Sequence, residues 1–345
     1  MSEISLIAID LAKHVFHLEA SDAAGNRLWE RRVRRDQLVK VVGSVSTTEI
    51  AMEACASAHH WGRQFAALGH TIRLIPPPEV SRLVDRRKKN DRRDTRAIRK
   101  AARDEDVRPV PLKSTADQEE QFEHRVREQW VGQRTATINQ VRAMLAEFGI
   151  VLPKGEGVLL SRCAELPADP RLAGMERLQV LLEAQFELLE RLSDLIDEAD
   201  RRLRKLAKTS PVARRLITVP GIGPVISTGC VAAVPDPTVF CCGRDFSAWI
   251  GIIPSQYSTG GKVQLGPITK RGSRYLRANL IHGARSLLAS IRRSKAEPTD
   301  GLLLWAKNLL GRMHWNKAVV ALANKLARII WTLMAHGGVY RPRLL

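Results

Sequence analysis

Residues 4–10 read ISLIAID, an apolar run that ends in an acid, and this pattern predicts a buried strand. Two more strands are predicted over 14–20 and 28–33, with a hairpin turn at 22–26, DAAGN, between them. A fourth strand, EIAMEA, covers 49–54 and carries another acid near its end. The N-terminal part of the chain is therefore expected to begin as a sheet.

Helices alternate with the later strands of this region. They are predicted over 36–44 and 60–68, and a fifth strand over 71–75 is stopped by three consecutive prolines. The order of three strands, helix, strand, helix, strand and helix is that of an RNase H-like α/β fold. In such a fold the first and fourth strands are neighbours, which brings Asp10 next to Glu53.

The last helix of this region lies in KKNDRRDTRAIR, residues 88–99, where two acids stand among many cations. Asp91 and Asp94 are three residues apart and therefore share one face of a helix. One interpretation is a solvated amphipathic helix with ordinary ion pairs. The other is a metal site, because acids that face a metal and arginines that face phosphate suit metal-assisted cutting of nucleic acid. The predicted phosphate contacts on this helix are Arg92, Arg93 and Arg96.

The four acids together favour the metal interpretation. Taken singly, Asp10 fits a turn cap after its strand and Glu53 fits a charge on an edge strand. Four carboxylates placed close together repel one another unless cations lie between them, and Mg²⁺ or Mn²⁺ prefers such oxygen ligands. Two such ions about 4 Å apart would hold the attacking and leaving oxygens of a phosphodiester. The predicted metal-binding and catalytic acids are Asp10, Glu53, Asp91 and Asp94.

The composition favours a nucleic-acid partner. The 345 residues include 55 Lys and Arg against 36 Asp and Glu, a formal net charge of +19. No membrane segment is expected, since the longest apolar run, 318–335, is interrupted by Asn324, Lys325 and Arg328. The five cysteines lack zinc spacing and the N-terminus lacks a signal peptide, so we expect a reduced, cytoplasmic protein.

Residues 113–209 are predicted to form a helical arm after an N-terminal domain that ends at residue 112. Two long helices, 115–148 and 172–207, flank a loop rich in Gly and Pro, and the second helix carries an apolar stripe at near-heptad spacing. We expect this coiled coil to dimerise, because such a seam seldom stays uncovered. The alternatives are a plain spacer or a nucleic-acid surface. The stripe consists of Leu178, Leu181, Gln185, Leu188, Leu192, Leu195, Ala199, Leu203 and Leu206, and the cations of the first helix are Arg125, Arg127, Arg134 and Arg142.

Residues 210–345 are predicted to form a mostly helical domain that opens with LITVPGIGPVIS, 216–227. The GIGP sequence is typical of a helix-hairpin-helix-like turn, whose backbone N–H groups often face a DNA phosphate. The turn then binds DNA through Gly221 and Gly223; the alternative is a tight corner without a ligand. The remaining predicted elements are helices over 302–310 and 317–335 and a frayed basic tail over 340–345.

A second candidate for chemistry is a serine beside a glycine pair. Residues 246–277 read FSAWIGIIPSQYSTGGKVQLGPITKRGSRYLR, and we expect Ser258 to lie in an exposed loop just before Gly260 and Gly261. A hydroxyl ringed by cations is suited to attack a phosphodiester. The alternative is a serine that merely caps a turn. The surrounding cations, which we also expect to bind nucleic acid, are Lys262, Lys270, Arg271, Arg274 and Arg277.

These segments resemble the IS110 family of bacterial transposases, whose N-terminal domain is RuvC-like, and most closely its IS1111 group. At the N-terminal end the resemblance is carried by AIDLAKHVF (8–16), AMEACASAHHWGRQFAALGH (51–70) and KKNDRRDTRAI (88–98). At the C-terminal end it is carried by GIIPSQYSTGGK (251–262) and GPITKRGSRYLR (266–277). The usual acidic motif of the family is KTDRxDA, and this chain has Asn90 for its Thr and Thr95 for its Ala, with both acids in place.

The resemblance implies an insertion-sequence transposase, or DNA recombinase, that combines a DEDD tetrad with a serine nucleophile. The tetrad falls on the four acids named above and the serine on Ser258, although some members have the serine directly before Gly, where this chain has Thr259. Ser255 is a poorer candidate because only Ser258 lies inside the motif. The family further implies a bridge RNA that pairs with donor and target DNA, and a dimer or tetramer that joins the two distant sites.

Two other functions stay open on the sequence. A structure-specific DNA endonuclease of the junction-resolvase type would use the acids with water, and Ser258 would be structural. A non-catalytic nucleic-acid-binding protein descended from a transposase would need none of these residues for chemistry.

Overall fold

The computed structural model describes residues 3–84, 91–162, 165–166, 169–259 and 262–342, without the side chains of residues 91, 92, 156, 258, 259, 262 and 263. Its backbone contacts divide the chain into two compact units, Met1–Gln118 and Glu119–Leu345. The helical arm and the C-terminal region expected from the sequence both fall in the second unit. Residues 88–90 of the basic stretch lie outside the described residues.

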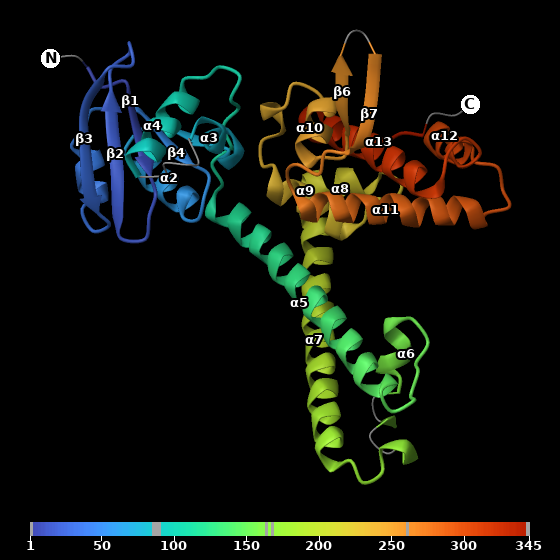
Figure 1. Ribbon diagram of the computed structural model, residues 1–345. Coiled ribbons are helices and arrows are strands. Elements are labelled where there is room, and N and C mark those ends of the chain that lie inside the picture. The colour runs from blue at the N-terminus through green and yellow to red at the C-terminus, as the bar shows by residue number, and fades with distance from the viewer. Residues whose placement is uncertain (1–2, 85–90, 163–164, 167–168, 260–261, 343–345) are drawn as a thin grey trace. The chain divides into compact units, whose positions relative to one another are not determined.

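The first unit is built on a mixed five-stranded sheet (Figure 1). Its strands are β1 (Leu6–Asp10), β2 (Val15–Ser21), β3 (Arg27–Arg34), β4 (Glu49–Glu53) and β5 (Thr71–Ile75). They lie in the order β3-β2-β1-β4-β5, in which β1 pairs antiparallel with β2 and parallel with β4. The expected neighbourhood of the first and fourth strands is therefore confirmed.

Helices cover both faces of this sheet, because successive side chains of a strand point to opposite sides. The helices are α1 (Leu38–Gly43), α2 (Ala58–Ala67), α3 (Pro77–Leu83) and α4 (Asp91–Ala102). Ile7 and Ile9 of β1 belong to the hydrophobic cluster formed with α1 and α2. Leu6 and Ala8 belong to the cluster on the other face, formed with α3 and α4. Asp10 has the parity of Ala8 and is therefore directed to the α4 face.

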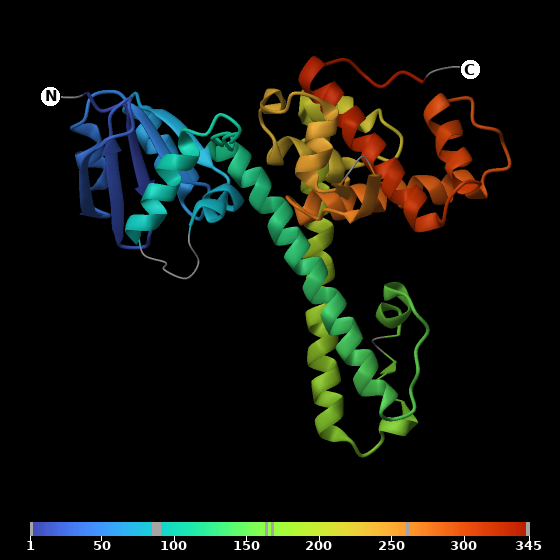
Figure 2. The same ribbon diagram turned by 45° about the horizontal axis from the view of Figure 1, so that its top comes forward.

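Two long helices cross in the second unit, as Figures 1 and 2 both show. They are α5 (Thr115–Ala146), whose first residues belong to the first unit, and α7 (Glu176–Thr209), with the short α6 (Glu156–Leu160) between them. Their common hydrophobic cluster lies at one end, where Val141 and Leu145 meet Leu182 and Leu189. Elsewhere Arg127 pairs with Asp200. The expected long helices are confirmed, but they cross instead of forming a continuous two-helix seam.

The apolar stripe predicted on α7 is partly wrong. The buried residues of α7 are Leu182, Phe186, Leu189, Leu192, Ile196, Ala199, Leu203 and Ala207. Leu181 and Leu188 are instead 55% and 44% exposed. The helix carries two adjacent apolar stripes, and intramolecular packing covers the one that contains Phe186 and Ile196. The other stripe, which includes Leu181 and Leu188, stays open to solvent.

The C-terminal part of the second unit is a helical core with one β-hairpin (Figure 1). The elements are α8 (Pro211–Ile217), α9 (Pro224–Ala233), α10 (Gly243–Ile250), β6 (Pro254–Thr259), β7 (Lys262–Ile268), α11 (Arg274–Arg293), α12 (Gly301–Leu310) and α13 (Trp315–His336). Buried side chains of the helices α8 to α13 form the core, and β6 pairs with β7 in antiparallel fashion.

Helix α13 has the length and composition of a membrane span, which the sequence reading did not expect. Its most apolar window has a mean hydropathy of 1.5, but half of that window is buried inside the protein. Leu322, Leu326 and Ile330 are fully buried in the helical core. This burial is typical of the core helix of a globular domain.

The C-terminal tail is anchored at Tyr340, so the expectation of a frayed end is wrong at this residue. The Tyr340 hydroxyl donates to the Asp300 carboxylate at 2.8 and 2.9 Å, and its backbone N–H donates to Thr218 Oγ1 at 2.9 Å. Burial, followed by the hydrogen bond to Asp300 and its charge, raises the pKa of Tyr340 well above its usual range. The phenol therefore stays a donor to Asp300.

Candidate active site

Two of the predicted acids end neighbouring parallel strands. Asp10 is the last residue of β1 and Glu53 the last of β4, and the register of the pair aligns Ile9 with Met52. Asp10 and Glu53 therefore occupy the next rung at the same edge of the sheet, and both are half-buried. This juxtaposition was expected from the strand order alone.

The thiol of Cys55 lies close enough to sense both acids. Its pKa is raised first by desolvation, then by the Glu53 carboxylate and, more weakly, by Asp10. Negative charges raise a thiol pKa because they disfavour a second anion beside them. The charges of both carboxylates thus reach the Cys55 thiol, which lies just beyond the end of β4.

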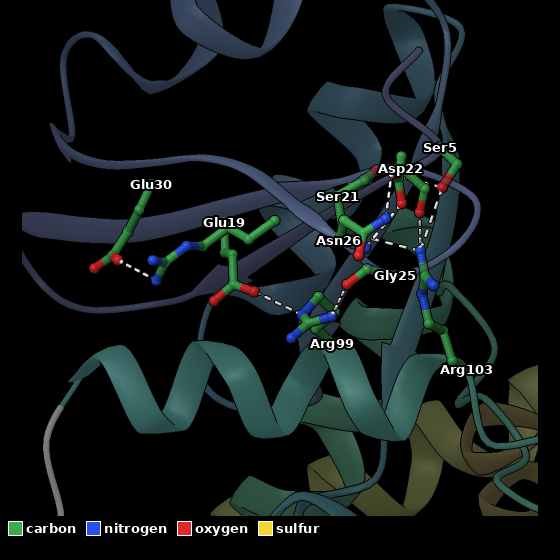
Figure 3. Close-up of polar contacts among 10 residues, drawn as sticks. Ser5, Glu19, Ser21, Asp22, Gly25, Asn26, Glu30, Arg99 and Arg103 are labelled. Carbon is green, nitrogen blue, oxygen red and sulfur yellow. Dashed lines mark hydrogen bonds and ion pairs between the residues drawn. The ribbon is translucent and has the colours of Figure 1, made fainter. Parts of the chain in front are cut away.

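Helix α4 is fastened to the β2–β3 hairpin by two arginines, shown in Figure 3. Arg99 Nε lies 2.6 Å from the Glu19 carboxylate, and Arg99 also donates to the Gly25 carbonyl at 2.6 Å. Arg103 donates to Ser21 Oγ at 3.2 Å and to the carbonyls of the turn that follows β2. We call these two arginines and their partners the α4 latch. Because Arg99 contacts Glu19 and Arg103 contacts Ser21, α4 runs parallel to β2 and antiparallel to β1.

The α4 latch indicates where Asp94 lies along the strands of the sheet. Glu19 pairs with Ala8 across the β2–β1 ladder, so the Arg99 turn of α4 lies at the level of Ala8. Asp94 lies five residues before Arg99, which is about 7.5 Å along a helix. Asp10 lies two residues after Ala8, which is a similar length of about 6.6 Å along a strand. Asp94 is half-buried, and by these lengths we expect its backbone near the level of Asp10, on the face of the sheet that α4 covers.

Asp91 begins α4 one turn before Asp94, and its side chain lies outside the described residues. Carboxylate oxygens are the donors that Mg²⁺ and Mn²⁺ prefer, so the residue types fit a metal site. No group of three His, Cys, Asp or Glu side chains is close enough to hold a metal within the described part of the chain. The four carboxylates thus suit such an ion by their chemistry, but the described side chains alone do not form a complete metal site.

A histidine that the sequence analysis did not single out lies beside Asp10. His17 is the cross-strand partner of Asp10 in the β1–β2 ladder, and only 8% of it is exposed. Directly opposite residues of a ladder share one face of the sheet. The sequence held a signal for this pairing, because only a short connection separates Asp10 at the end of β1 from the start of β2 at Val15.

The cations of α4 divide between its two faces. Arg93 and Arg96 are exposed, as phosphate contacts require, and the side chain of Arg92 is not described. Arg99 and Arg103 stand in the same basic stretch, yet they are used inside the protein by the α4 latch.

The candidate nucleophile lies in a strand instead of a loop. Ser258 belongs to β6, where its backbone is aligned with Val263 of β7. The side chains of Ser258, Thr259 and Lys262, and all of Gly260 and Gly261, lie outside the described residues. The alternative, Ser255, donates its hydroxyl to the Pro267 carbonyl at 3.0 Å and is half-buried. The expectation of a loop is wrong because residues 254–259 pair with the strand that follows.

The cations that follow the hairpin are partly structural. Arg277 is half-buried, and its guanidinium donates to the Ile250 and Arg271 carbonyls at 2.9 and 3.1 Å. Lys270, Arg271 and Arg274 are exposed. The exposed three remain available for a polyanion, whereas Arg277 ties the start of α11 to the end of α10.

The two glycines of the GIGP turn have different environments. Gly221 has φ +83°, and a Cβ there would lie 3.2 Å from the Gly283 carbonyl oxygen of α11. Gly223 has an ordinary negative φ of −97°, and a Cβ there would meet nothing within 4 Å. Gly223 borders a cavity of ≈ 480 Å³ in front of α9, which Arg127, Asn279 and His282 also line. Gly221 is thus needed for packing, whereas Gly223 leaves the start of α9 open.

Comparison with known proteins gives one consistent family. The Transposase IS116/IS110/IS902 family model matches residues 213–298, and an IS110 DEDD transposase model matches residues 7–150. A Pseudomonas aeruginosa protein named probable family 20 transposase is 38% identical over 98% of this chain and 99% of its own length. The transposase for insertion sequence element IS1111A of Coxiella burnetii is 36% identical over 99% of this chain and 92% of its own length. The transposase for insertion sequence element IS1328 of Yersinia enterocolitica is 36% identical over 99% of both chains.

Proposed function

Because this chain belongs to the IS116/IS110/IS902 family of insertion-sequence transposases, we propose that it cuts and rejoins DNA with a metal-binding acidic tetrad and a serine nucleophile. The observation that carries the proposal is geometric. Asp10 and Glu53 end adjacent parallel strands, and the pairing of Arg99 with Glu19 supports an Asp94 near the level of Asp10. Asp91, on the same helix, completes the tetrad.

The acids hold one or two divalent ions in this proposal. Once bound, Mg²⁺ or Mn²⁺ would stabilise the negative charge that develops on phosphodiester oxygens. The chain contributes the four carboxylates, and the covered faces of the sheet keep β1 and β4 rigid beneath them. Arg93 and Arg96, exposed on the outer side of α4, contact the DNA phosphates and hold the strand against the acids.

Ser258 is the proposed nucleophile. Its hydroxyl oxygen bonds to phosphorus, the P–O bond to the deoxyribose breaks, and the hydroxyl proton passes through solvent to the leaving oxygen. A hydroxyl of a second DNA end then attacks the phosphorus of the phosphoserine. The P–O bond to the serine breaks and the serine oxygen takes up a proton, so each step forms one P–O bond and breaks one. Lys270, Arg271 and Arg274 are the described, exposed cations of this region that would stabilise the charged phosphorane.

The partners in this proposal are donor DNA, target DNA and a bridge RNA that pairs with both. The protein acts as a homo-oligomer, dimer or tetramer, in the cytoplasm. A net charge of +19 suits simultaneous binding of RNA and DNA, because each phosphate that is neutralised releases counterions.

Recombination between donor and target plasmids tests this function, with the flanking RNA of the element supplied or withheld. We expect products only with RNA and divalent metal, and none from Asp10→Asn or Ser258→Ala. Thr259→Ala is the matched control and should retain exchange and a covalent protein–DNA adduct. Cutting that persists in Ser258→Ala would instead establish a resolvase-type nuclease that uses water. Full activity in Asp10→Asn would overturn the catalytic role of the tetrad.

A further inference from the structure

A basic hollow of ≈ 470 Å³ lies between the beginning of α10 and the middle of α13. Arg244 of α10 and Lys325 and Arg328 of α13 line it. All of the lining residues are described, and none of them is acidic. We call this hollow the α10–α13 pocket. It lies within the second unit and shares no residue with the β6–β7 hairpin or the GIGP turn.

The packing of one glycine builds the α10–α13 pocket. Gly243 is buried, and a Cβ there would lie 3.0 Å from both the Cα and the carbonyl oxygen of Arg328. Any side chain at position 243 would therefore push the start of α10 and the backbone of α13 slightly apart. Lys325, Arg328 and Thr332 follow one face of α13, at spacings of three and four residues, and therefore line the same side of the hollow.

The cations of the α10–α13 pocket form no ion pair with an acid in the part of the chain that the structure describes. Arg244, Lys325 and Arg328 are exposed, and none of the ion pairs found among the described residues involves them. The nearest acid in sequence, Asp245, accepts from the Cys241 backbone at 3.2 Å and does not line the hollow. Like charges held in one hollow repel one another, and an anion that enters it removes that cost.

We infer that the α10–α13 pocket binds the phosphate backbone of a nucleic acid. The volume of the hollow is larger than that of a single phosphate group, so it has room for more than one phosphate of a nucleic-acid backbone. Arginine and lysine are the side chains that bind phosphate oxygens, and contacts of this kind position a nucleic acid without reading its sequence. The inference rests on the proposed function, and it adds an anchoring contact that the sequence motifs did not indicate. DNA and RNA share this backbone chemistry, and the experiment separates them.

The test compares full-length wild type with Lys325→Gln/Arg328→Gln. Fluorescence anisotropy measures binding to two fluorescein-labelled probes, a mixed-sequence DNA duplex and a single-stranded RNA, over a series of KCl concentrations. The plot of log K against log salt has a negative slope. Loss of two phosphate contacts should make this slope less steep, by about 1.8 for duplex DNA or about 1.4 for RNA. The probe whose slope becomes less steep is the one that occupies the pocket. Lys325→Arg/Arg328→Lys keeps both charges and should restore the wild-type slope.

The matched control is Arg177→Gln/Arg191→Gln. It removes the same charge from exposed positions of α7 that stand among acids, and its slopes should stay close to those of wild type. Equal slopes for the pocket variant and wild type would overturn the inference, as would an equal loss in the control. Failure of wild type to bind either probe would instead count against the proposed function itself. Circular dichroism confirms that each variant is folded.

Discussion

The guanidinium of Arg99 on α4 lies 2.6 Å from the carboxylate of Glu19 on β2, and the two side chains are only 14% and 5% exposed. Arg99 also holds the Gly25 carbonyl, so one side chain joins α4 to a strand and to the turn that follows it. The pair is buried, and Arg99 lies five residues after Asp94, about 7.5 Å along the helix. We infer that it positions the acidic end of α4, because its contacts join this helix to β2 and to the turn after β2.

Breaking this pair on one side should destabilise the protein. In Arg99→Leu the Glu19 carboxylate is left buried without its cation, which typically costs about 3–5 kcal/mol. The double variant Glu19→Leu/Arg99→Leu removes both charges and should recover most of that loss. Urea unfolding of the four proteins in a double-mutant cycle measures the coupling. A double variant as unstable as the single one would mean that Arg99 acts mainly through Gly25.

Arg99→Lys should change the metal requirement more than the stability. Lysine keeps a charge beside Glu19 but lacks the second arm that reaches Gly25, so α4 is held less firmly. Loss of a residue that positions metal ligands typically weakens metal affinity about 10–100-fold. The Mg²⁺ concentration for half-maximal DNA cleavage should therefore rise by roughly tenfold.

Arg73→Lys is the matched control for that measurement. Arg73 likewise joins one carboxylate, Glu49 at 3.7 Å, to one carbonyl, that of Val107 at 3.2 Å. Glu49 begins β4, at the opposite end of the strand from Glu53. An equal rise in the Mg²⁺ requirement of both variants would show general loosening of the unit instead of displacement of Asp94.

A glycine of α11 that packs against the GIGP turn and a glycine within the turn predict opposite phenotypes. A Cβ at Gly283 would lie 2.4 Å from the Gly221 carbonyl oxygen and 2.7 Å from Ile226 Cδ1. Gly283→Ala should therefore lose about 1–3 kcal/mol of stability, as overpacked sites do. Gly223→Ala adds its methyl to open space and should fold like wild type. If α9 receives a DNA phosphate, Gly223→Ala should still weaken duplex binding, which anisotropy measures; unchanged binding would leave the turn a purely structural corner.

Stability should fall in mild acid because of His124. Burial, assisted by Arg127, lowers the pKa of His124 from 6.5 to about 4, and the residue is 3% exposed. Between these values the unfolded chain binds a proton that the folded chain does not, so stability rises with pH across this window. Acidification from pH 6.5 to 5 should cost about 2 kcal/mol through this residue.

Urea unfolding at several pH values measures this effect by comparing wild type with His124→Gln, which cannot titrate. His282→Gln is the control, because His282 is exposed on α11. The pH slope should shrink only in His124→Gln. His124 Nδ1 lies 2.8 Å from the Tyr275 hydroxyl, so a constant offset in stability from losing that contact is expected at every pH.

The sheet of the first unit was predictable because its signals are local. Proline and glycine punctuation sets the ends of the strands, and the apolar run of β1 and the placing of Asp10 and Glu53 at strand ends follow from single segments. The inward role of Arg99 was not predictable in the same way. A basic helix gives no local sign of which cation will meet a buried acid, since Glu19 belongs to a strand and Gly25 to a turn some 75 residues away.

The errors in the second unit have a common physical cause. Ser258 was expected in a loop because glycine pairs favour turns, yet the strand pairing of residues 254–259 depends on the segment after those glycines. On α7 two apolar stripes lie side by side, and periodicity alone does not say which one the chain covers. In both places the outcome is decided by a partner segment and not by the segment itself.

The stripe that α7 leaves open predicts how the protein assembles. Leu181 and Leu188 are seven residues apart, 55% and 44% exposed, and half-buried Leu195 continues the same line. An apolar line of this spacing is suited to pack against a second helix. Leu181→Glu/Leu188→Glu should therefore reduce the proposed homo-oligomer to monomers in light scattering while the circular dichroism spectrum stays unchanged. Lys205→Glu, an exposed position on another side of α7, is the control and should keep the wild-type mass. A double variant with unchanged mass would show that the copies associate through another surface.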